Sequence, residues 1–182
     1  MSSEQIVNDH RTFRIILQGM SHPGKVYSLP GAQRTGLIHL LSFLMDNEVS
    51  FAVIDDKKTE AALARQTGSR PVSPKEADYI IVTHGSTGER LTACRRGSLE
   101  YPDTGATIIY LVEELTEGKD GIVLSGPGVK GKISLHVKGI HASEFELLQK
   151  LNSEFPLGVD AVFLDLSGRI ACIPRSSQIG VN

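Results

Sequence analysis

Closely spaced strand-like runs constrain the fold of this chain more than any other feature of its sequence. Three largely apolar runs lie at residues 107–112, 121–124 and 132–137. The turn-rich stretches 117–120 and 126–128 lie between them. Strands with such short connections are expected to be antiparallel neighbours. A second hairpin is expected where Ser167 and Gly168 separate the runs 161–166 and 169–173.

Apolar residues at helical spacing predict four helices, and two further apolar runs predict strands. The helices span residues 9–20, 37–44, 57–66 and 143–154, and the strands span 50–54 and 79–82. The apolar stripe of the first helix consists of Phe13, Ile16, Leu17 and Met20. The third helix is expected to begin after the capping residues Asp55 and Asp56 and to end before Gly68. At the start of the last helix, Ser143 and Glu146 fit a capping box.

These elements together predict the fold class. Their connections include lengths suited to crossovers as well as lengths suited to hairpins, which indicates that parallel and antiparallel strands occur together. The sequence therefore predicts an α/β fold with a mixed β-sheet flanked by helices.

The composition limits the chain to a few classes of protein. Its 182 residues, 40% of them hydrophobic, suffice for one domain over residues 1–182 with a sizeable core. The formal net charge of −2 gives no footprint for binding nucleic acid or an anionic membrane surface. No apolar run approaches the roughly 20 residues of a membrane helix, and the N-terminus lacks a signal-peptide pattern. A soluble cytoplasmic protein is expected.

The cysteines and histidines show no pattern of a metal or redox site. Cys94 and Cys172 have neither zinc-ligand spacing nor Cys-x-x-Cys spacing, so both are expected to be reduced structural thiols. Cys172 alternates with apolar neighbours and is expected to point into the core. His84, His136 and His141 also lack the spacing of metal ligands, so no metal is predicted.

Six short motifs occur in a fixed order along the chain. They read HRTFR at 10–14, MSHPG at 20–24, PDTGAT at 102–107, LSGPGV at 124–129, FPLGVD at 155–160 and IPR at 173–175. As a set they are specific, and through them the chain resembles the PhnH family from residue 10 to residue 177. The family commonly has Glu where this chain has Asp103, and two threonines where it has Ser176 and Ser177. Both replacements keep the functional group.

The resemblance implies a function in phosphonate catabolism. Members of the family are accessory subunits of the carbon-phosphorus (C-P) lyase core complex, with PhnG, PhnI and PhnJ as partners. An early step of that system makes ribose 1-methylphosphonate 5-triphosphate from ATP and methylphosphonate. The resemblance also implies a homodimer with the fold of pyridoxal-phosphate (PLP)-dependent transferases but without a PLP site, so no cofactor is expected. The later radical chemistry is associated with PhnJ, and this chain lacks the three-cysteine cluster that such a centre requires.

Five basic residues are candidates for binding a phosphonate or nucleotide anion. Arg11 and Arg14 lie on or beside one short helix, and Arg175 follows a strand at a predicted sheet end, where bidentate contacts to phosphoryl oxygens are feasible. Lys130 and Lys132 lie at the end of the glycine-rich stretch 125–132. This stretch is either a tight turn that joins two strands or a loop whose backbone N–H groups bind an anion. The alternatives are an ion pair of Arg14 with Asp160 or another carboxylate, a pair of Arg175 with Asp160, and subunit contacts.

The remaining motif residues are expected to be architectural. Prolines fix backbone direction and glycines permit unusual dihedrals or close approach. The residues concerned are Pro23, Gly24, Gly126, Gly128, Phe155, Pro156, Gly158, Asp160 and Pro174.

No self-contained catalytic constellation accompanies these motifs. The sequence contains no nucleophile elbow, no paired catalytic cysteine and histidine, and no Rossmann glycine motif after a strand. An accessory subunit is therefore the first hypothesis. The alternatives are an independent transferase or hydrolase acting on a phosphorylated or phosphonate substrate, and a solitary binding module for phosphonates or nucleotides.

Overall fold

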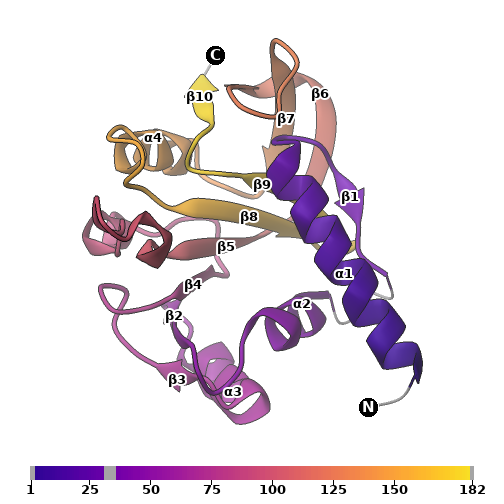
Figure 1. The fold of residues 1–182 in the computed structure, drawn as a ribbon, viewed down its shortest axis with the longest axis vertical. Helices are drawn as coiled ribbons and strands as arrows, with labels where there is room; N and C mark the ends of the chain where they lie inside the picture. Colours follow the sequence, from indigo (N-terminus) through magenta and orange to yellow (C-terminus); the bar gives the residue numbers. More distant parts are fainter. Residues whose placement is uncertain (1–2, 31–35, 181–182) are drawn as a thin grey trace.

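The computed structural model describes residues 3–30 and 36–180. Four parallel strands form the centre of the fold. These strands are β2 (Ser50–Ile54), β4 (Tyr79–Val82), β5 (Thr107–Val112) and β8 (Asp160–Asp165). They belong to a seven-stranded sheet with the order β1-β9-β8-β5-β4-β2-β3 (Figure 1). Its other strands are β1 (Tyr27–Ser28), β3 (Arg70–Pro71) and β9 (Arg169–Ile173). Because β9 is antiparallel to β8 and to β1, the sheet is mixed.

A second, antiparallel sheet packs against the first. It has the order β10-β6-β7, from β6 (Glu114–Ser125), β7 (Ile133–Lys138) and β10 (Gln178–Gly180). The helices are α1 (Ser3–Ser21), α2 (Gly36–Leu44), α3 (Lys57–Thr67) and α4 (Ser143–Leu151), with the 3₁₀ turns η1 (Arg90–Ala93) and η2 (Pro102–Thr104). In Figure 1, α1 lies beside β9 and β1, whereas α2 and α3 lie toward the β3 edge of the sheet.

Strand alternation divides the core into two clusters on opposite faces of the large sheet. Ile80, Ile108 and Phe163 point to one face, where they pack with side chains of α4 and of the second sheet. Ile81 and Ile109 point to the other face, where side chains of α1, α2 and α3 cover them. Both faces of a parallel sheet must be covered in this way, so the predicted α/β class is confirmed.

Most of the predicted elements are present. The strands at 50–54 and 79–82 are confirmed, and so is the hairpin of β8 and β9. In α3, the Asp56 side chain accepts a hydrogen bond from Thr59 N, and Gly68 ends the helix in a left-handed conformation. The first helix begins earlier than predicted, at Ser3, and the last ends earlier, at Leu151.

The predicted antiparallel pairing of 107–112 with 121–124 is wrong. β5 lies between β4 and β8 and is parallel to both, while β6 pairs with β7 in the other sheet. The supposed turn at 117–120 lies inside β6, at a register shift between Glu117 and Ile122. Glycine within a strand can mark a bulge as well as a turn, and this sequence signal does not distinguish the two.

The predicted apolar stripe of α1 is only partly buried. Ile16 and Met20 pack against the core, but Phe13 and Leu17 are about half exposed, at 49% and 48%. The reason is Gly19, where an added Cβ would lie 2.8 Å from Cys172 Sγ. Because the helix approaches β9 through this glycine, its buried face is turned away from Phe13 and Leu17.

The predicted capping box at the start of α4 is also wrong. The cap position is Ala142, without a side-chain hydrogen bond, and Ser143 Oγ is instead 2.7 Å from His141 Nδ1. The buried acid of this helix is Glu144, which is only 2% exposed. Glu144 shares a helix face with Leu148 and Leu151, so the helical period would have placed it inward.

Glu144 joins α4 to the central strands. Its Oε1 accepts a hydrogen bond of 2.8 Å from Thr87 N, and its Oε2 accepts one of 3.0 Å from the buried Tyr110 hydroxyl. The Thr87 hydroxyl lies 3.0 Å from both oxygens. Burial and the nearby Glu144 carboxylate raise the pKa of Tyr110 well above its ordinary value, so Tyr110 stays a proton donor to Glu144.

We expect Glu144→Ala to lower the free energy of unfolding by about 3 kcal/mol, because it leaves buried donors of Thr87 and Tyr110 without an acceptor. Glu146→Ala on the same helix is the matched control, since Glu146 is exposed and its loss should change stability by less than about 0.5 kcal/mol. Urea denaturation of the two variants measures the difference. Equal stabilities would contradict the role assigned to Glu144.

Candidate anion-binding site

Two of the predicted arginines line one pocket between α1 and the segment that follows it. Arg11, Arg14 and Gln18 are three, four and seven residues apart, so they share one face of α1. Ser28 and Pro30 lie opposite, and Ile15 completes a pocket of about 280 Å³. The pocket therefore combines two guanidinium groups with an amide and a hydroxyl group.

The arginines of this pocket are available for an anion. Both side chains are exposed, and neither guanidinium forms an ion pair with a carboxylate among the residues described. The alternative prediction of a pair between Arg14 and Asp160 is wrong, because Asp160 pairs with Arg175. Two guanidinium groups on one helix face can offer several parallel N–H donors to phosphoryl or phosphonyl oxygens.

Arg175 lies outside this pocket, in an ion pair that holds the start of β8. Its Nη2 donates a 2.6 Å hydrogen bond to Asp160 Oδ2, and its backbone N–H donates one of 2.8 Å to Asp160 Oδ1. A further guanidinium N–H donates to the carbonyl oxygen of Pro102. The Arg175 side chain is 13% exposed. The pairing of Arg175 with Asp160, weighed as the alternative, is thus present.

Beside this ion pair, the FPLGVD motif packs closely against two other segments, one at Asn152 and one at Gly105. A Cβ at Gly158 would lie 2.3 Å from Asn152 Oδ1, and one at Gly105 would lie 2.4 Å from the Gly158 carbonyl oxygen. Asn152 in turn accepts a hydrogen bond from Val159 N at 2.7 Å. The Phe155–Pro156 peptide bond is cis. Of the two reasons weighed for a glycine at position 158, unusual dihedrals and close approach, the structure shows a close approach. Pro174 directly precedes Arg175 in the segment after β9.

The glycine-rich turn between β6 and β7 packs against the exit from α1. A Cβ at Gly128 would lie 2.2 Å from the Ser21 carbonyl oxygen and 2.9 Å from Pro23, and one at Gly24 would lie 2.8 Å from Leu124. Gly126 similarly faces the carbonyl oxygen of Ser176. The MSHPG and LSGPGV motifs therefore pack against each other, a contact that the sequence does not predict.

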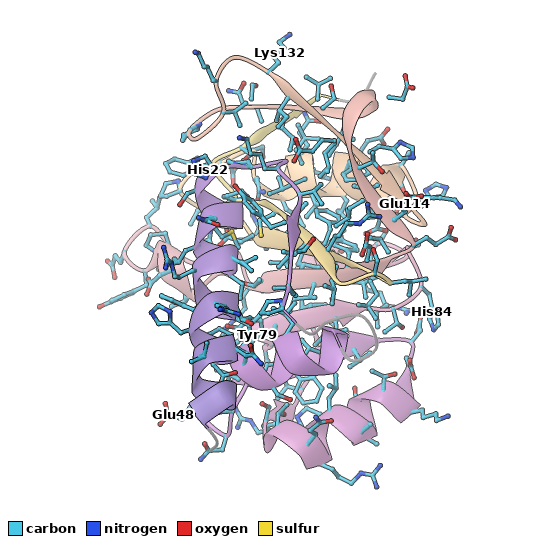
Figure 2. The ribbon with its side chains drawn as sticks, turned by 90° about the vertical axis from the view of Figure 1, so that its right-hand side faces the viewer. His22, Glu48, Tyr79, His84, Glu114 and Lys132 are labelled. Atoms are coloured by element: carbon cyan, nitrogen blue, oxygen red, sulfur yellow. The ribbon has the colours of Figure 1, made fainter. Side chains whose placement is uncertain are left out.

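The two candidate lysines project from this turn. Lys130 and Lys132 are both exposed, and Lys132 lines a separate pocket with Gln149 and Gln178. Figure 2 shows Lys132 beyond the end of α1 that His22 marks. The structure therefore does not bring the lysines together with Arg11 and Arg14, and their binding of an anion stays a prediction.

Both cysteines are buried and free. Burial raises the pKa of Cys172 to about 12 and that of Cys94 to about 11, so both remain thiols at neutral pH. Among the described residues, no three His, Cys, Asp or Glu side chains are grouped to hold a metal ion. No helix in the same part of the chain is long and apolar enough to cross a membrane.

Sequence reasoning missed two polar residues of the arginine pocket. Gln18 lies seven residues after Arg11, so the helical period alone could have placed it on the same face. Ser28 enters through β1, a two-residue strand whose pairing with β9 has no local sequence signal.

The chain belongs to the PhnH family, because residues 2–180 match the family described as bacterial phosphonate metabolism protein (PhnH). Two named relatives extend the comparison over nearly the whole chain. One, from Rhizobium meliloti (strain 1021), is named alpha-D-ribose 1-methylphosphonate 5-triphosphate synthase subunit PhnH. It is 34% identical over 187 residues, covering 97% of this chain and 92% of the relative. The other, from Stutzerimonas stutzeri, is provisionally named C-P lyase subunit protein HtxG and is 30% identical over 179 residues, covering 97% of this chain and 88% of the relative.

We expect Arg175→Ala to lower the free energy of unfolding by about 2 kcal/mol, because it removes charge-assisted hydrogen bonds to a partly buried carboxylate. Arg65→Ala on α3 is the control, since Arg65 is exposed and should change stability by less than about 0.5 kcal/mol. Chemical denaturation of both variants makes the measurement. If the Arg175 variant were as stable as the wild type, a structural role of Arg175 would be excluded, and Arg175 would again be a candidate anion ligand.

Proposed function

We propose that this chain is an accessory subunit of a C-P lyase core complex in phosphonate catabolism. The observation that carries the proposal is family membership over residues 2–180, together with two relatives whose names assign them to such systems. In this function the chain supports formation of ribose 1-methylphosphonate 5-triphosphate from ATP and methylphosphonate. Its partners are PhnG-, PhnI- and PhnJ-type subunits.

The proposal includes a contribution of the arginine pocket to anion binding. Arg11 and Arg14, which form no ion pair with any residue that the structure describes, place positive charge beside Gln18 and Ser28 in a pocket of about 280 Å³. Methylphosphonate and the triphosphate of ATP both carry the oxygens that guanidinium groups bind in pairs. We assign the pocket to one of these groups in the assembled complex.

The fold is proposed to be related to that of PLP-dependent transferases, without the cofactor site. The mostly parallel seven-stranded sheet covered by helices supports this relation. A Schiff-base lysine needs a sheltered site that lowers its pKa, whereas every lysine side chain placed by the structure is exposed. The chain is also proposed to form a homodimer, as the family resemblance implies.

We expect this chain alone to show no turnover of ATP with methylphosphonate, and its omission from the reconstituted core to abolish or strongly reduce formation of the ribose triphosphate product. The reason is that its sequence contains no nucleophile elbow, no paired catalytic cysteine and histidine, and no Rossmann glycine motif. Product formation followed by ³¹P NMR, with and without this chain, makes the measurement. Turnover by the isolated chain would establish an independent transferase or hydrolase instead.

We expect the double variant Arg11→Ala/Arg14→Ala to bind inorganic triphosphate at least about tenfold more weakly than the wild type, since each charged hydrogen bond contributes about 1.5 kcal/mol or more. Isothermal titration of the folded chain measures the affinity, and Arg65→Ala is the matched exposed-arginine control. Lys130→Ala/Lys132→Ala tests the turn in the same assay. Unchanged affinity of the Arg11/Arg14 variant would exclude the pocket.

A further inference from the structure

Three large apolar side chains are exposed on two loops near the amino-terminal ends of β5 and β8. Leu99 is 77% exposed, Tyr101 is 62% exposed and Phe155 is 67% exposed. We call these three residues the apolar tip. Exposed apolar residues on a soluble surface are ordinary when scattered, but a group of them marks an interaction site.

The two loops of the apolar tip are joined by direct hydrogen bonds. Gly158 N donates to the Arg96 carbonyl oxygen at 2.9 Å, which links the segment after Phe155 to the segment before Leu99. Arg96 reinforces the link, because its Nε donates to the Leu151 carbonyl oxygen at 2.8 Å and its Nη2 lies 2.9 Å from Glu154 Oε2. The side chains of the tip are therefore presented by one connected support.

The loop that carries Leu99 and Tyr101 is also ordered internally. Ser98 N donates to the Tyr101 carbonyl oxygen at 3.1 Å, and Tyr101 N donates to Ser98 Oγ at 3.0 Å. Directly after Tyr101, the Pro102 carbonyl oxygen accepts a hydrogen bond from the Arg175 guanidinium. Because the backbone of this loop is already ordered, binding of a partner does not cost the entropy of ordering the loop, which favours affinity.

The two segments that carry the apolar tip, residues 97–103 and 153–157, contain acidic residues and no basic ones. Glu100, Asp103 and Glu154 are exposed beside it. Glu154 pairs with Arg96, whereas Glu100 and Asp103 form no ion pair within the described part of the chain. Electrostatic complementarity then requires a partner whose binding surface is edged by lysine and arginine side chains.

We propose that the apolar tip docks into an apolar depression edged by basic side chains on another subunit of the assembly. This inference rests on the proposed function, since it identifies the surface through which the chain joins its partners. Aromatic side chains surrounded by polar groups are typical of the residues that dominate binding energy at interfaces. The Asp160–Arg175 pair and Arg96 are positioning groups for this surface.

The test uses the full-length chain and its partner subunits, expressed together without it. The variant Leu99→Ser/Tyr101→Ser/Phe155→Ser removes the tip. The matched control is Leu166→Ser, because Leu166 is 78% exposed at the β8–β9 turn, at the other end of β8. Thermal melting confirms that both variants fold, and titration of immobilised partner complex measures the dissociation constant.

We expect the triple variant to bind about a thousandfold more weakly than the wild type, because each of the three lost interface anchors costs about tenfold or more. Leu166→Ser should bind like the wild type. A second variant, Glu100→Lys/Asp103→Lys, keeps the apolar side chains, and its slower association at low salt is the expected sign of a basic rim on the partner.

Three outcomes would overturn the proposal, and they differ from one another. Wild-type binding by the triple variant would place the contact elsewhere and leave the proposed function intact. Failure of the wild type to bind any partner subunit would overturn the proposed function as well. Loss of a homodimer in sedimentation by the triple variant, with partner binding unchanged, would assign the tip to a contact between copies.

Discussion

The burial of the central parallel strands on both faces is the constraint from which the rest of the structure follows. β4 and β5 consist almost entirely of buried apolar residues, and a parallel sheet of this kind is stable only between two covering layers. Three helices supply one layer. α4 and the second sheet supply the other. Glu144 fixes the position of α4 on the sheet, because its carboxylate accepts a hydrogen bond from the buried Tyr110 hydroxyl.

At each end of β8, a carboxylate of the strand forms an ion pair with an arginine. At its start, Asp160 binds Arg175, and at its end the buried carboxylate of Asp165 binds Arg169 and the turn that follows. Burial alone would raise the pKa of Asp165, but hydrogen bonds from Arg169, Ser167 and the Leu115 N–H lower it overall. Because the folded-state pKa lies below the unfolded value, this contribution to stability is present above roughly pH 4 and is lost as the pH falls.

Local patterns predicted most of what local physics decides, although the capping box of α4 and the start of α1 are wrong. The larger failures occur where contacts are made between distant segments. The spacing of apolar residues predicts the helices and the strands β2 and β4, and the turn residues Ser167 and Gly168 predict the β8–β9 hairpin. β5 was assigned to the wrong neighbours because sequence spacing does not reveal that a strand belongs to a different sheet from the next one. In the candidate site, the charge of Arg11 and Arg14 and their place on one helix predict them, whereas Ser28 and the Arg175–Pro102 contact arise only from tertiary packing.

The distribution of the basic groups favours a subunit over a self-sufficient enzyme. A site that performs phosphoryl or glycosyl chemistry surrounds its substrate with preorganised donors in a water-excluded cavity. Here Arg11 and Arg14 are exposed on one side of a small pocket, Lys130 and Lys132 project from a separate turn, and Arg175 is engaged by Asp160. Such an arrangement can attract and orient an anion, but it does not enclose one. A complete site would need further walls, which the proposed assembly would supply if another chain closed the pocket.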